Sequence, residues 1–459
     1  NHFKKEWAEQ YPLQIINEHS GILYFVVLSD SGSPALEADT FSFHHHTLQE
    51  FENQLKDTEA QINSVDEYLK DISPTAIEAF KEEISQLSQG YDFEDALGQG
   101  IKEAEDHLIL LSGWIPVSLE RGLKDYLAKT QVIHFSETGK ADDNPPIRLH
   151  NNWFSRLFEP ISKMYMLPFY NEFDLTPFFA PFFMFFFGFC NADMAYGAVI
   201  ILLAFLMQRK AKNAAMKSMM TLLMFFGIAS IIMGWVMGSA LGYDLKEVAA
   251  LGDKIIIRNN GQIFNFALLL GLIQILFGIA ISAIKQIIQS GFKYGLKSIG
   301  TFLFILALGV LGASQLGADI SAVQPYLKYP MYAGLALIFL FNNPQKNLLI
   351  NILSGIWEMY NIITGFFGDI LSYIRLFALG VSSAILGFVV NSIGAQMAGI
   401  PVIGPVIFIV FMLFGHTLNL ALGGLSGFVH PLRLTFVEFY KNAAFAGPGI
   451  AYKPFGKKE

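Results

Sequence analysis

Cysteine and charged residues are both scarce in this chain. Cys190 is the single cysteine among 459 residues, which excludes an intrachain disulfide framework and a metal site built from clustered cysteines. Only 15% of the residues are charged, against about 25% in an average soluble domain. Apolar residues take their place: they make up 53% of the sequence and include 43 phenylalanines. Much of the chain is therefore suited to an apolar environment.

Basic residues are fewer than acidic ones, and the formal net charge is −8. Most of the acids lie in residues 1–150, so a polar N-terminal part precedes an apolar remainder. This acidic excess fits neither a nucleic-acid binder nor a protein held on anionic lipid by charge. The first residues lead into a polar stretch, so no cleavable signal is expected, and a start at Asn1 suggests part of a longer gene product.

The N-terminal part carries a heptad pattern typical of a coiled coil. Apolar residues recur at spacings of three and four over residues 48–72, Pro74 ends the run, and the pattern resumes over residues 77–87. We interpret the two runs as a helical hairpin that packs on itself. A stalk offered to the helices of a partner is the alternative, and the two interpretations are compatible.

A small α/β lobe is expected to follow the coiled coil. Residues 108–111 and 131–135 are predicted to be short strands that flank a helix over residues 118–127. Asp142-Asp143-Asn144-Pro145-Pro146 is a linker, and residues 151–177 continue the connection to the apolar part.

Three adjacent histidines, His44, His45 and His46, look like a metal-binding tract. Three consecutive residues cannot share one face of a helix, and no second cluster follows them. We therefore predict no metal site.

Eight apolar runs follow residue 177, and most have roughly the length that spans a bilayer as a helix. Only Asn191-Ala192-Asp193 joins the first two, so a tight hairpin is expected there. The predicted fold is a polytopic α-helical membrane domain over residues 178–459, with eight transmembrane helices of which the last two are long and tilted. It follows a cytoplasmic coiled-coil hairpin and α/β lobe over residues 1–150. The runs cover residues 178–190, 193–208, 218–241, 263–285, 296–317, 328–342, 367–395 and 402–429.

The distribution of Lys and Arg indicates how such a domain is oriented. Eight crossings place both ends on one side of the membrane, and the positive-inside rule makes the more basic side cytoplasmic. In the loops of the opposite side, acids balance the bases. The N-terminal part and the tail are therefore predicted to be cytoplasmic. The bases on their side are Arg209, Lys210, Lys212, Lys217, Lys285, Lys293, Lys297, Lys346, Lys453, Lys457 and Lys458.

Arg375 lies well inside the seventh apolar run. A charge on a membrane helix costs about 2.5–3.5 kcal/mol on insertion scales, so it needs a reason; snorkelling to the headgroups is the simplest one. Asp369 precedes Arg375 by about 9 Å along the helix axis, so a direct pair within the helix is not assured. The small hydroxyls on the face of Arg375 predict that this face lies at a hydrated interface and not against lipid. The residues of that face are Ser372, Leu379 and Ser382.

Polar residues also interrupt the eighth run. His430 lies one turn before Arg433, and Pro431 between them removes a backbone donor and should kink or loosen the helix. We favour a functional role for His430 and Arg433. The other polar residues of this helix are His416, Asn419 and Ser426.

Structural roles compete with functional ones at several of these positions. A buried hydrogen bond between helices explains His416 and Asn419 as well as a path for ions does. Glu438 follows near the cytoplasmic end, where Lys441 is an alternative partner for it. Asp193 is expected to cap or brace the first hairpin rather than to conduct ions.

Signatures of an enzyme are weak. Asp369, in Gly365-Phe-Phe-Gly368-Asp369, and Asp193 suggest an intramembrane aspartyl protease, but nothing in the sequence places the two carboxylates on facing helices. The sequence has no phosphate loop, His-Glu-x-x-His motif or nucleophile elbow. We predict no catalytic site and no cofactor in this chain.

Two arginine motifs resemble those of the membrane a-type subunit, also called subunit I, of V/A-type rotary ATPases. They are Ser372-Tyr-Ile-Arg375-Leu-Phe-Ala-Leu and His430-Pro-Leu-Arg433-Leu-Thr-Phe-Val-Glu438-Phe-Tyr. The resemblance covers roughly residues 107–440. Three upstream stretches agree with it: Gly113-Trp-Ile-Pro, Asp174-Leu-Thr-Pro-Phe-Phe-Ala-Pro-Phe-Phe and Ala192-Asp-Met-Ala-Tyr-Gly.

The resemblance implies a non-catalytic stator subunit in a prokaryotic plasma membrane. Its partners would be the carboxylates of a rotor ring of c-type proteolipids, and peripheral-stalk subunits on the cytoplasmic side. Arg375 would be the essential arginine that faces each ring carboxylate, and Arg433 the second arginine, with His430 beside it in the access path. The residues assigned to the ion path are Arg375, Arg433, His430, Ser372, Ser382, Ser383, His416, Asn419, Ser426 and Glu438.

Two positions depart from the family pattern. Gly423 stands where relatives with proton-pumping roles can carry an acid, and Ser383 where they can carry a histidine. Each departure removes a titratable group from the path, which favours Na⁺ slightly over H⁺ as the transported ion. The cytoplasmic part is also short for the family.

A secondary transporter is the rival interpretation, because transporters also use intramembrane charges. It predicts matching features in two repeated halves, whereas residues 178–342 contain few candidate path groups. A purely structural membrane anchor is a third possibility, and Arg375 argues against it.

Overall fold

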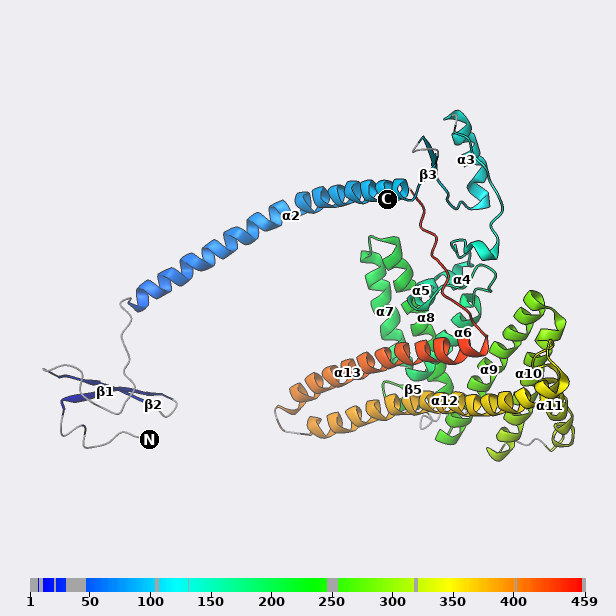
Figure 1. Cartoon of the computed structure of the whole chain (residues 1–459). Helices are drawn as coiled ribbons and strands as arrows, with labels where there is room; N and C mark the ends of the chain where they lie inside the picture. The colour runs from blue at the N-terminus through cyan, green and yellow to red at the C-terminus, as the bar shows by residue number, and fades with distance from the viewer. Residues whose placement is uncertain are drawn as a thin grey trace. The chain divides into compact units, whose positions relative to one another are not determined.

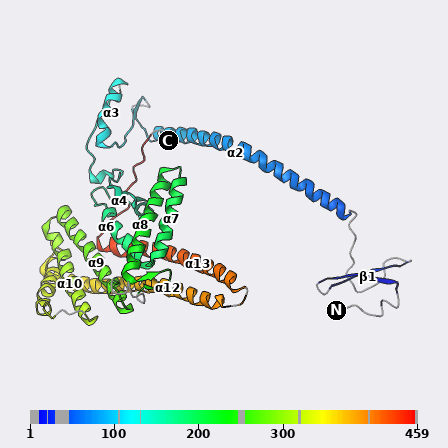
Figure 2. The same ribbon diagram turned by 180° about the vertical axis from the view of Figure 1, so that it is seen from behind.

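The computed structural model describes residues 7, 11–19, 22–29, 47–103, 107–130, 132–245, 255–317, 321–399, 401 and 403–455, which are mostly helical (Figure 1; Figure 2). The described residues divide into two compact units, one up to Leu111 and the other over Ser112–Phe455. The histidine tract at residues 44–46 lies outside the described residues. The functional boundaries at residues 150 and 177 remain predictions.

The first unit consists of two antiparallel strand pairs joined by one long helix. The helix begins at a capping box, in which the Thr47 hydroxyl accepts from the Glu50 amide and the Glu50 carboxylate accepts from the Thr47 amide. The elements are β1 (Leu13–His19), β2 (Ile22–Val27), α2 (Leu48–Gly98), β3 (Ile101–Glu103) and β4 (Leu108–Leu110).

The predicted helical hairpin is wrong, because α2 is a single helix of 51 residues that continues through Pro74. A proline inside a helix removes one backbone hydrogen bond at a cost of about 3 kcal/mol, which the hydrogen bonds and helix-forming residues on both sides outweigh here. No residue of α2 is buried. Its heptad residues are exposed, Leu55 by 62% and Ile84 by 65%, so the unit itself does not cover the apolar stripe.

Two of the three elements predicted for the α/β lobe form, one in each of the two compact units. β4 confirms the first strand, and α3 (Val117–Lys129) confirms the helix. The second strand is wrong for the part that the structure describes, because residues 132–135 are in no strand. Ile133 and Phe135 are largely exposed, so the β-prone side chains there lack the packing surface that turns strand propensity into a strand.

All eight apolar runs are helices, and the tight turn at residues 191–193 is confirmed. Five helices in the described part of the chain, α8, α9, α10, α12 and the helix that starts with α13, are long and apolar enough to cross a membrane, and α6 is a shorter apolar helix. The count of eight crossings therefore remains a prediction. The helices are α6 (Thr176–Cys190), α7 (Met194–Lys210), α8 (Ala214–Met237), α9 (Asn260–Ser290), α10 (Phe292–Gln315), α11 (Lys328–Phe341), α12 (Leu348–Ala398) and α13 (Gly404–Arg433).

Short elements connect the long helices. Before the first apolar helix they are η1 (Ala141–Asp143), α4 (Trp153–Arg156) and α5 (Glu159–Tyr165). The later ones are β5 (Ser239–Ala240), β6 (Tyr243–Asp244), η4 (Gln324–Tyr326), the π-helix η5 (Leu434–Phe439) and α14 (Tyr440–Asn442).

The two helices with the arginine motifs, α12 and α13, run side by side, in yellow to orange and orange to red in Figure 1, and Figure 2 shows them from behind. α12 begins well before the predicted run and has 51 residues. That is about 75 Å of helix, against a hydrocarbon core of about 30 Å, so α12 must tilt strongly or extend beyond the core.

Phenylalanines of α6 form the centre of the core. Phe179, Phe183 and Phe186 are fully buried, and the Phe183 ring stacks on Phe226 of α8 at 5.6 Å between centroids. α6 also packs against both α12 and α13, so the aromatic core supports the two arginine helices directly.

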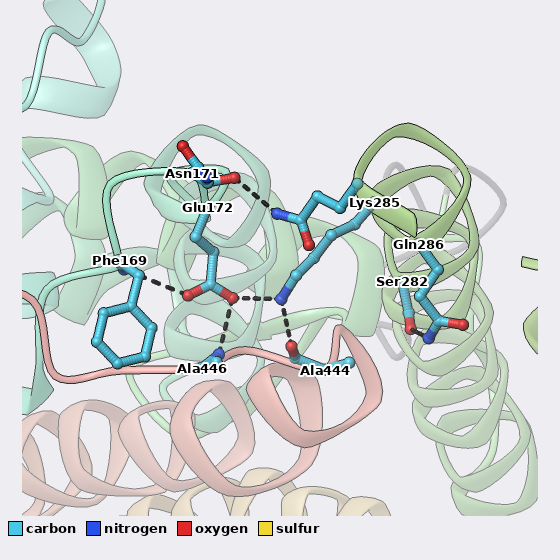
Figure 3. Close-up of polar contacts among 9 residues, drawn as sticks. Phe169, Asn171, Glu172, Ser282, Lys285, Gln286, Ala444 and Ala446 are labelled. Carbon is cyan, nitrogen blue, oxygen red and sulfur yellow. Dashed lines mark hydrogen bonds and ion pairs between the residues drawn. The ribbon is translucent and has the colours of Figure 1, made fainter. Parts of the chain in front are cut away.

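A buried ion pair holds the C-terminal segment against α9 (Figure 3). Lys285 of α9 pairs with Glu172 and also donates to the Ala444 carbonyl, and the same Glu172 oxygen accepts from the Ala446 amide at 2.7 Å. The side chains of Lys285 and Glu172 are only 10% and 4% exposed. We call these four residues the Lys285 clamp. It anchors the chain just beyond α13, η5 and α14, which carry part of the candidate site.

Candidate functional site

Facing helices bring the two arginines near one histidine. Arg375 lies on α12, Arg433 ends α13, and the charges of both act on His430, one turn before Arg433. Arg375 is partly exposed. Among the residues that the structure describes, no carboxylate forms an ion pair with it. The guanidinium therefore has no acidic partner within the described part of the chain.

A second group of polar residues lies where α13 gives way to the π-helix η5. The Glu438 carboxylate is 3% exposed, and its Oε1 lies 3.9 Å from Nε of Arg433. Its Oε2 is buried and has no hydrogen-bond partner among the residues that the structure describes. Ser372 of α12 donates to the Gly368 carbonyl at 3.3 Å, and its side chain neighbours the Glu438 carboxyl. We call Ser372, His430, Arg433 and Glu438 the Glu438 cluster.

The π-helix explains how these side chains reach one another. Pro431 has no amide hydrogen, which weakens the regular ladder at the end of α13, and η5 follows three residues later. A π-helix changes the angular spacing of side chains and is frequent at functional sites. Arg433 and Glu438 are five residues apart, which suits a wider turn better than a regular one.

Asp369 and Lys441 have partners that the sequence did not indicate. Lys441 Nζ lies 3.1 Å from Asp369 Oδ1, and the Asn442 amide donates to Asp369 Oδ2 at 2.8 Å. Asp369 therefore ties α12 to α14 and does not pair with Arg375. The alternative pair of Glu438 with Lys441 is not formed.

A third polar group links α7, α12 and α13. The Tyr196 hydroxyl lies 2.7 Å from Nδ1 of His416 and accepts from the Asn419 amide at 2.9 Å. Nε2 of His416 lies 3.1 Å from Oδ1 of Asn391, whose amide donates to the Leu241 carbonyl at 2.7 Å. We call Tyr196, Asn391, His416 and Asn419 the Tyr196 network. His416 and Asn419 thus make the inter-helix hydrogen bonds that were one of their two interpretations.

Asp193 caps and braces the first hairpin, as predicted. Its Oδ1 accepts from the amides of Ala195 and Tyr196 at the start of α7. The carboxylate also accepts from the amides of Leu241 and Gly242, which fixes the turn after α8. Asp193 and Asp369 each have their own structural partners. They therefore do not form the pair of facing carboxylates that an intramembrane aspartyl protease needs.

Comparison with known proteins agrees with the arginine motifs. The model of the V-type ATPase 116kDa subunit family matches residues 35–240. The A-type ATP synthase subunit I of Methanothermobacter thermautotrophicus is 31% identical over 358 residues, 74% of this chain and 50% of that protein. The chain is therefore similar to subunit I of A-type and V-type ATP synthases. Subunit I of Methanocaldococcus jannaschii is 25% identical over 447 residues, 89% of this chain and 63% of its own length. The V-type ATP synthase subunit I of Borreliella burgdorferi is 26% identical over 462 residues, 95% and 74% of the two chains.

The predicted path residues fall into three sets. The structure brings Ser372, His430, Arg433 and Glu438 together near Arg375, and it places His416 and Asn419 in the Tyr196 network. The last set, Ser382, Ser383 and Ser426, makes no side-chain hydrogen bond with any described residue; Ser382 is exposed and the other two are partly exposed.

Sequence reasoning missed three polar residues: Tyr196, Asn391 and Asn191. Tyr196 and Asn391 carry half of the Tyr196 network. Asn191, in the turn before α7, is fully buried. A polar residue within or next to an apolar run was the available signal, since such residues are expensive in a membrane.

Proposed function

We propose that this chain is the stationary membrane subunit of a rotary V/A-type ATPase and forms the path of H⁺ or Na⁺ against a rotor ring. ATP hydrolysis takes place elsewhere in the complex. One observation carries the proposal: Arg375 is partly exposed on α12, and none of the described carboxylates pairs with it. A guanidinium keeps its charge in a membrane, so it needs a partner, and a carboxylate on another chain fits by charge.

The physics of such a ring explains the use of a fixed arginine. A ring carboxylate that faces lipid must be neutral, either protonated or loaded with an ion. Opposite a guanidinium the ionised form is favoured, so the ion leaves into one half of the path. The other half reloads the carboxylate before it returns to lipid. We assign these halves to the Glu438 cluster and the Tyr196 network, which lie on two sides of Arg375 along the helix pair.

The side chains along the proposed path favour Na⁺ over H⁺ as the transported ion. Ser383 and Gly423 lack titratable side chains, and the Tyr196 network offers amides, a hydroxyl and one imidazole. Neutral oxygen groups solvate a cation without needing to exchange a proton. The carboxylate site of the ring itself decides the ion.

Ion uptake by vesicles that contain the complete complex tests this function. ATP is added while Na⁺ is varied at fixed pH. We expect ATP-dependent Na⁺ uptake that a protonophore does not abolish; acidification that the protonophore collapses would assign H⁺ instead. Transport that needs no ATP and exchanges one solute gradient for another would contradict the proposal and favour a secondary transporter.

Lys and Arg at the helix ends support a cytoplasmic location for both termini. Arg209 and Lys210 end α7, and Lys293 and Lys297 lie in the first turns of α10. Lys346 precedes α12 on the same predicted side. With this orientation, the Glu438 cluster belongs to the cytoplasmic half of the path, and the Tyr196 network to the outer half.

Cysteine labelling checks this orientation. In a Cys190→Ala background, cysteines at Lys212 and Ser290 are expected to react only with an impermeant thiol reagent on the cytoplasmic side. A cysteine at Ala322 is expected to react only from the outside. All three positions are exposed, so the reagent can reach them. Labelling of Ser290 and Ala322 from the same side would break the eight-crossing topology.

The exposed stripe of α2 fits a stator that resists torque. None of the residues of α2 is buried and its heptad residues are exposed, and a coiled coil needs a second helix to cover such an apolar stripe. We assign this surface to helices of the peripheral-stalk subunits.

A further inference from the structure

Two stripes of residues run along α12, one exposed and one buried, and Arg375 lies in the exposed one. Exposed residues recur around it at spacings of three and four, and buried residues recur at the same spacings on another face. Tyr373, in the buried stripe, is two residues before Arg375, so their side chains point about 160° apart. The rotation of α12 about its axis therefore decides where Arg375 points. The exposed stripe contains Gly368, Leu371, Ala378 and Ser382, and the buried stripe contains Asp369, Tyr373, Leu376 and Gly380.

A buried hydrogen bond joins Tyr373 to α9. The Tyr373 hydroxyl donates to Oε1 of Gln274 at 2.6 Å, and the two residues are 1% and 0% exposed. The Tyr373 ring lies against Gly271, one turn before Gln274, where a Cβ would overlap the ring. α9 therefore offers both a recess for the ring and an acceptor for the hydroxyl, and both hold α12 at one rotation.

Stability alone does not explain this hydrogen bond. Nε2 of Gln274 is buried and has no hydrogen-bond partner among the residues that the structure describes. A buried donor without a partner lowers the stability of a fold, and two apolar side chains of similar shape would avoid that loss. Buried polar groups that lower stability can instead specify how helices fit together, as a single asparagine does in a coiled coil.

A second buried contact holds the same stripe of α12. Asp369, one turn before Tyr373, binds Lys441 and Asn442 of α14. The Asn442 amide also donates to the Glu438 carbonyl at 2.8 Å. The buried stripe is thus tied to α9 at Tyr373 and to α14 at Asp369, so rotation of α12 would break contacts with two different elements.

We propose that the hydrogen bond from Tyr373 to Gln274 sets the rotation of α12 that points Arg375 toward the rotor ring, and holds it there while the ring turns. Apolar packing between helices has little directional preference, whereas a hydrogen bond weakens steeply when its geometry changes. Tyr373 and Gln274 are positioning residues, because they act on the ion path only through Arg375. This role rests on the proposed function, which supplies the ring that Arg375 faces.

The double variant Tyr373→Phe/Gln274→Leu removes the hydrogen bond and leaves apolar side chains in its place. In vesicles with the complete complex, we expect the number of ions taken up per ATP hydrolysed to fall about fivefold, as for the loss of one neutral hydrogen bond. The thermal stability of the complex should stay the same or rise, so a purely structural role predicts an unchanged ratio. Tyr360→Phe is the matched control on the same helix: Tyr360 is 59% exposed, and both quantities should stay unchanged.

Distances between spin labels test the rotation of α12 without ATP. The labels are attached to cysteines at Thr364, three turns before Arg375 in the exposed stripe, and at Ser290, at the end of α9, in a Cys190→Ala complex. Both positions are exposed. We expect one narrow distance distribution in the otherwise native complex and a broader one in the double variant. With Tyr360→Phe the distribution should stay narrow.

The outcomes distinguish this role from the proposed function. An unchanged ratio of ions to ATP, or an unchanged distance distribution, in the double variant would overturn the positioning role even if wild-type vesicles take up ions as proposed. If wild-type vesicles show no ATP-driven uptake, the proposed function fails, and the distance distribution alone decides whether this hydrogen bond sets the rotation of α12.

Discussion

Arg375→Lys is expected to abolish ATP-driven ion uptake, as completely as Arg375→Ala does, while the complex still assembles. No described carboxylate pairs with Arg375, and the proposed function gives it a carboxylate of another chain as its partner. A guanidinium stays charged, with an unperturbed pKa above about 12, and presents a planar fork to a carboxylate, whereas a buried lysine can lose its proton. On the proposed function, a lysine at this position is therefore expected not to stabilise the ionised form of the ring carboxylate in a low-dielectric environment.

The measurement is ATP-driven uptake in vesicles, corrected for the amount of assembled complex. Arg433→Lys is the matched control on the facing helix. Its side chain is 51% exposed and its Nε lies 3.9 Å from Oε1 of Glu438, so a lysine there can keep the weak ion pair. We expect it to lower uptake less than Arg375→Lys does. Near-normal uptake by Arg375→Ala would contradict the proposed role of Arg375 and favour the transporter interpretation.

Lys285→Met is expected to lower the free energy of unfolding by about 3–5 kcal/mol, because it leaves the Glu172 carboxylate buried without its cation. The same change removes the donor to the Ala444 carbonyl and frees the segment beyond α13. The free energy is measured by denaturant titration of the purified protein in mild detergent. The double variant Lys285→Met/Glu172→Gln should recover part of the loss, because no unpaired charge remains.

An exposed ion pair serves as the control for the Lys285 clamp. Lys124 and Glu120 are 2.6 Å apart on α3, with side chains 46% and 37% exposed. Lys124→Met should change the free energy of unfolding by less than about 1 kcal/mol, because water already solvates both charges. If Lys124→Met and Lys285→Met lowered the free energy of unfolding equally, burial of the Lys285 clamp would not account for its contribution to stability.

Local patterns predicted the helices well and their ends poorly. The apolar runs identified every α-helix from α6 to α13, because a long apolar stretch in a membrane has few alternatives to a helix. Pro74 was taken as an end, yet α2 continues through it, because the penalty of one residue is small beside the hydrogen bonds of a helix of 51 residues. The strand at residues 131–135 failed in its described part, because strand propensity needs a partner surface.

For the candidate site, too, the sequence predicted some features and not others. The sequence alone singled out Arg375, Arg433 and His430, because a charge within an apolar run is costly wherever the helix packs. It also identified Asp193 as a cap from its place before an apolar helix. These inferences depend only on residue type and neighbours along the chain.

Only the tertiary structure decided which polar groups meet. Asp369 pairs with Lys441 rather than Arg375, and Tyr196 joins His416 although 220 residues separate them. The Tyr373 hydroxyl reaches Gln274 because α9 and α12 pack together there. Such partnerships depend on how helices cross and on the register between them, and periodicity within a single helix carries no information about either.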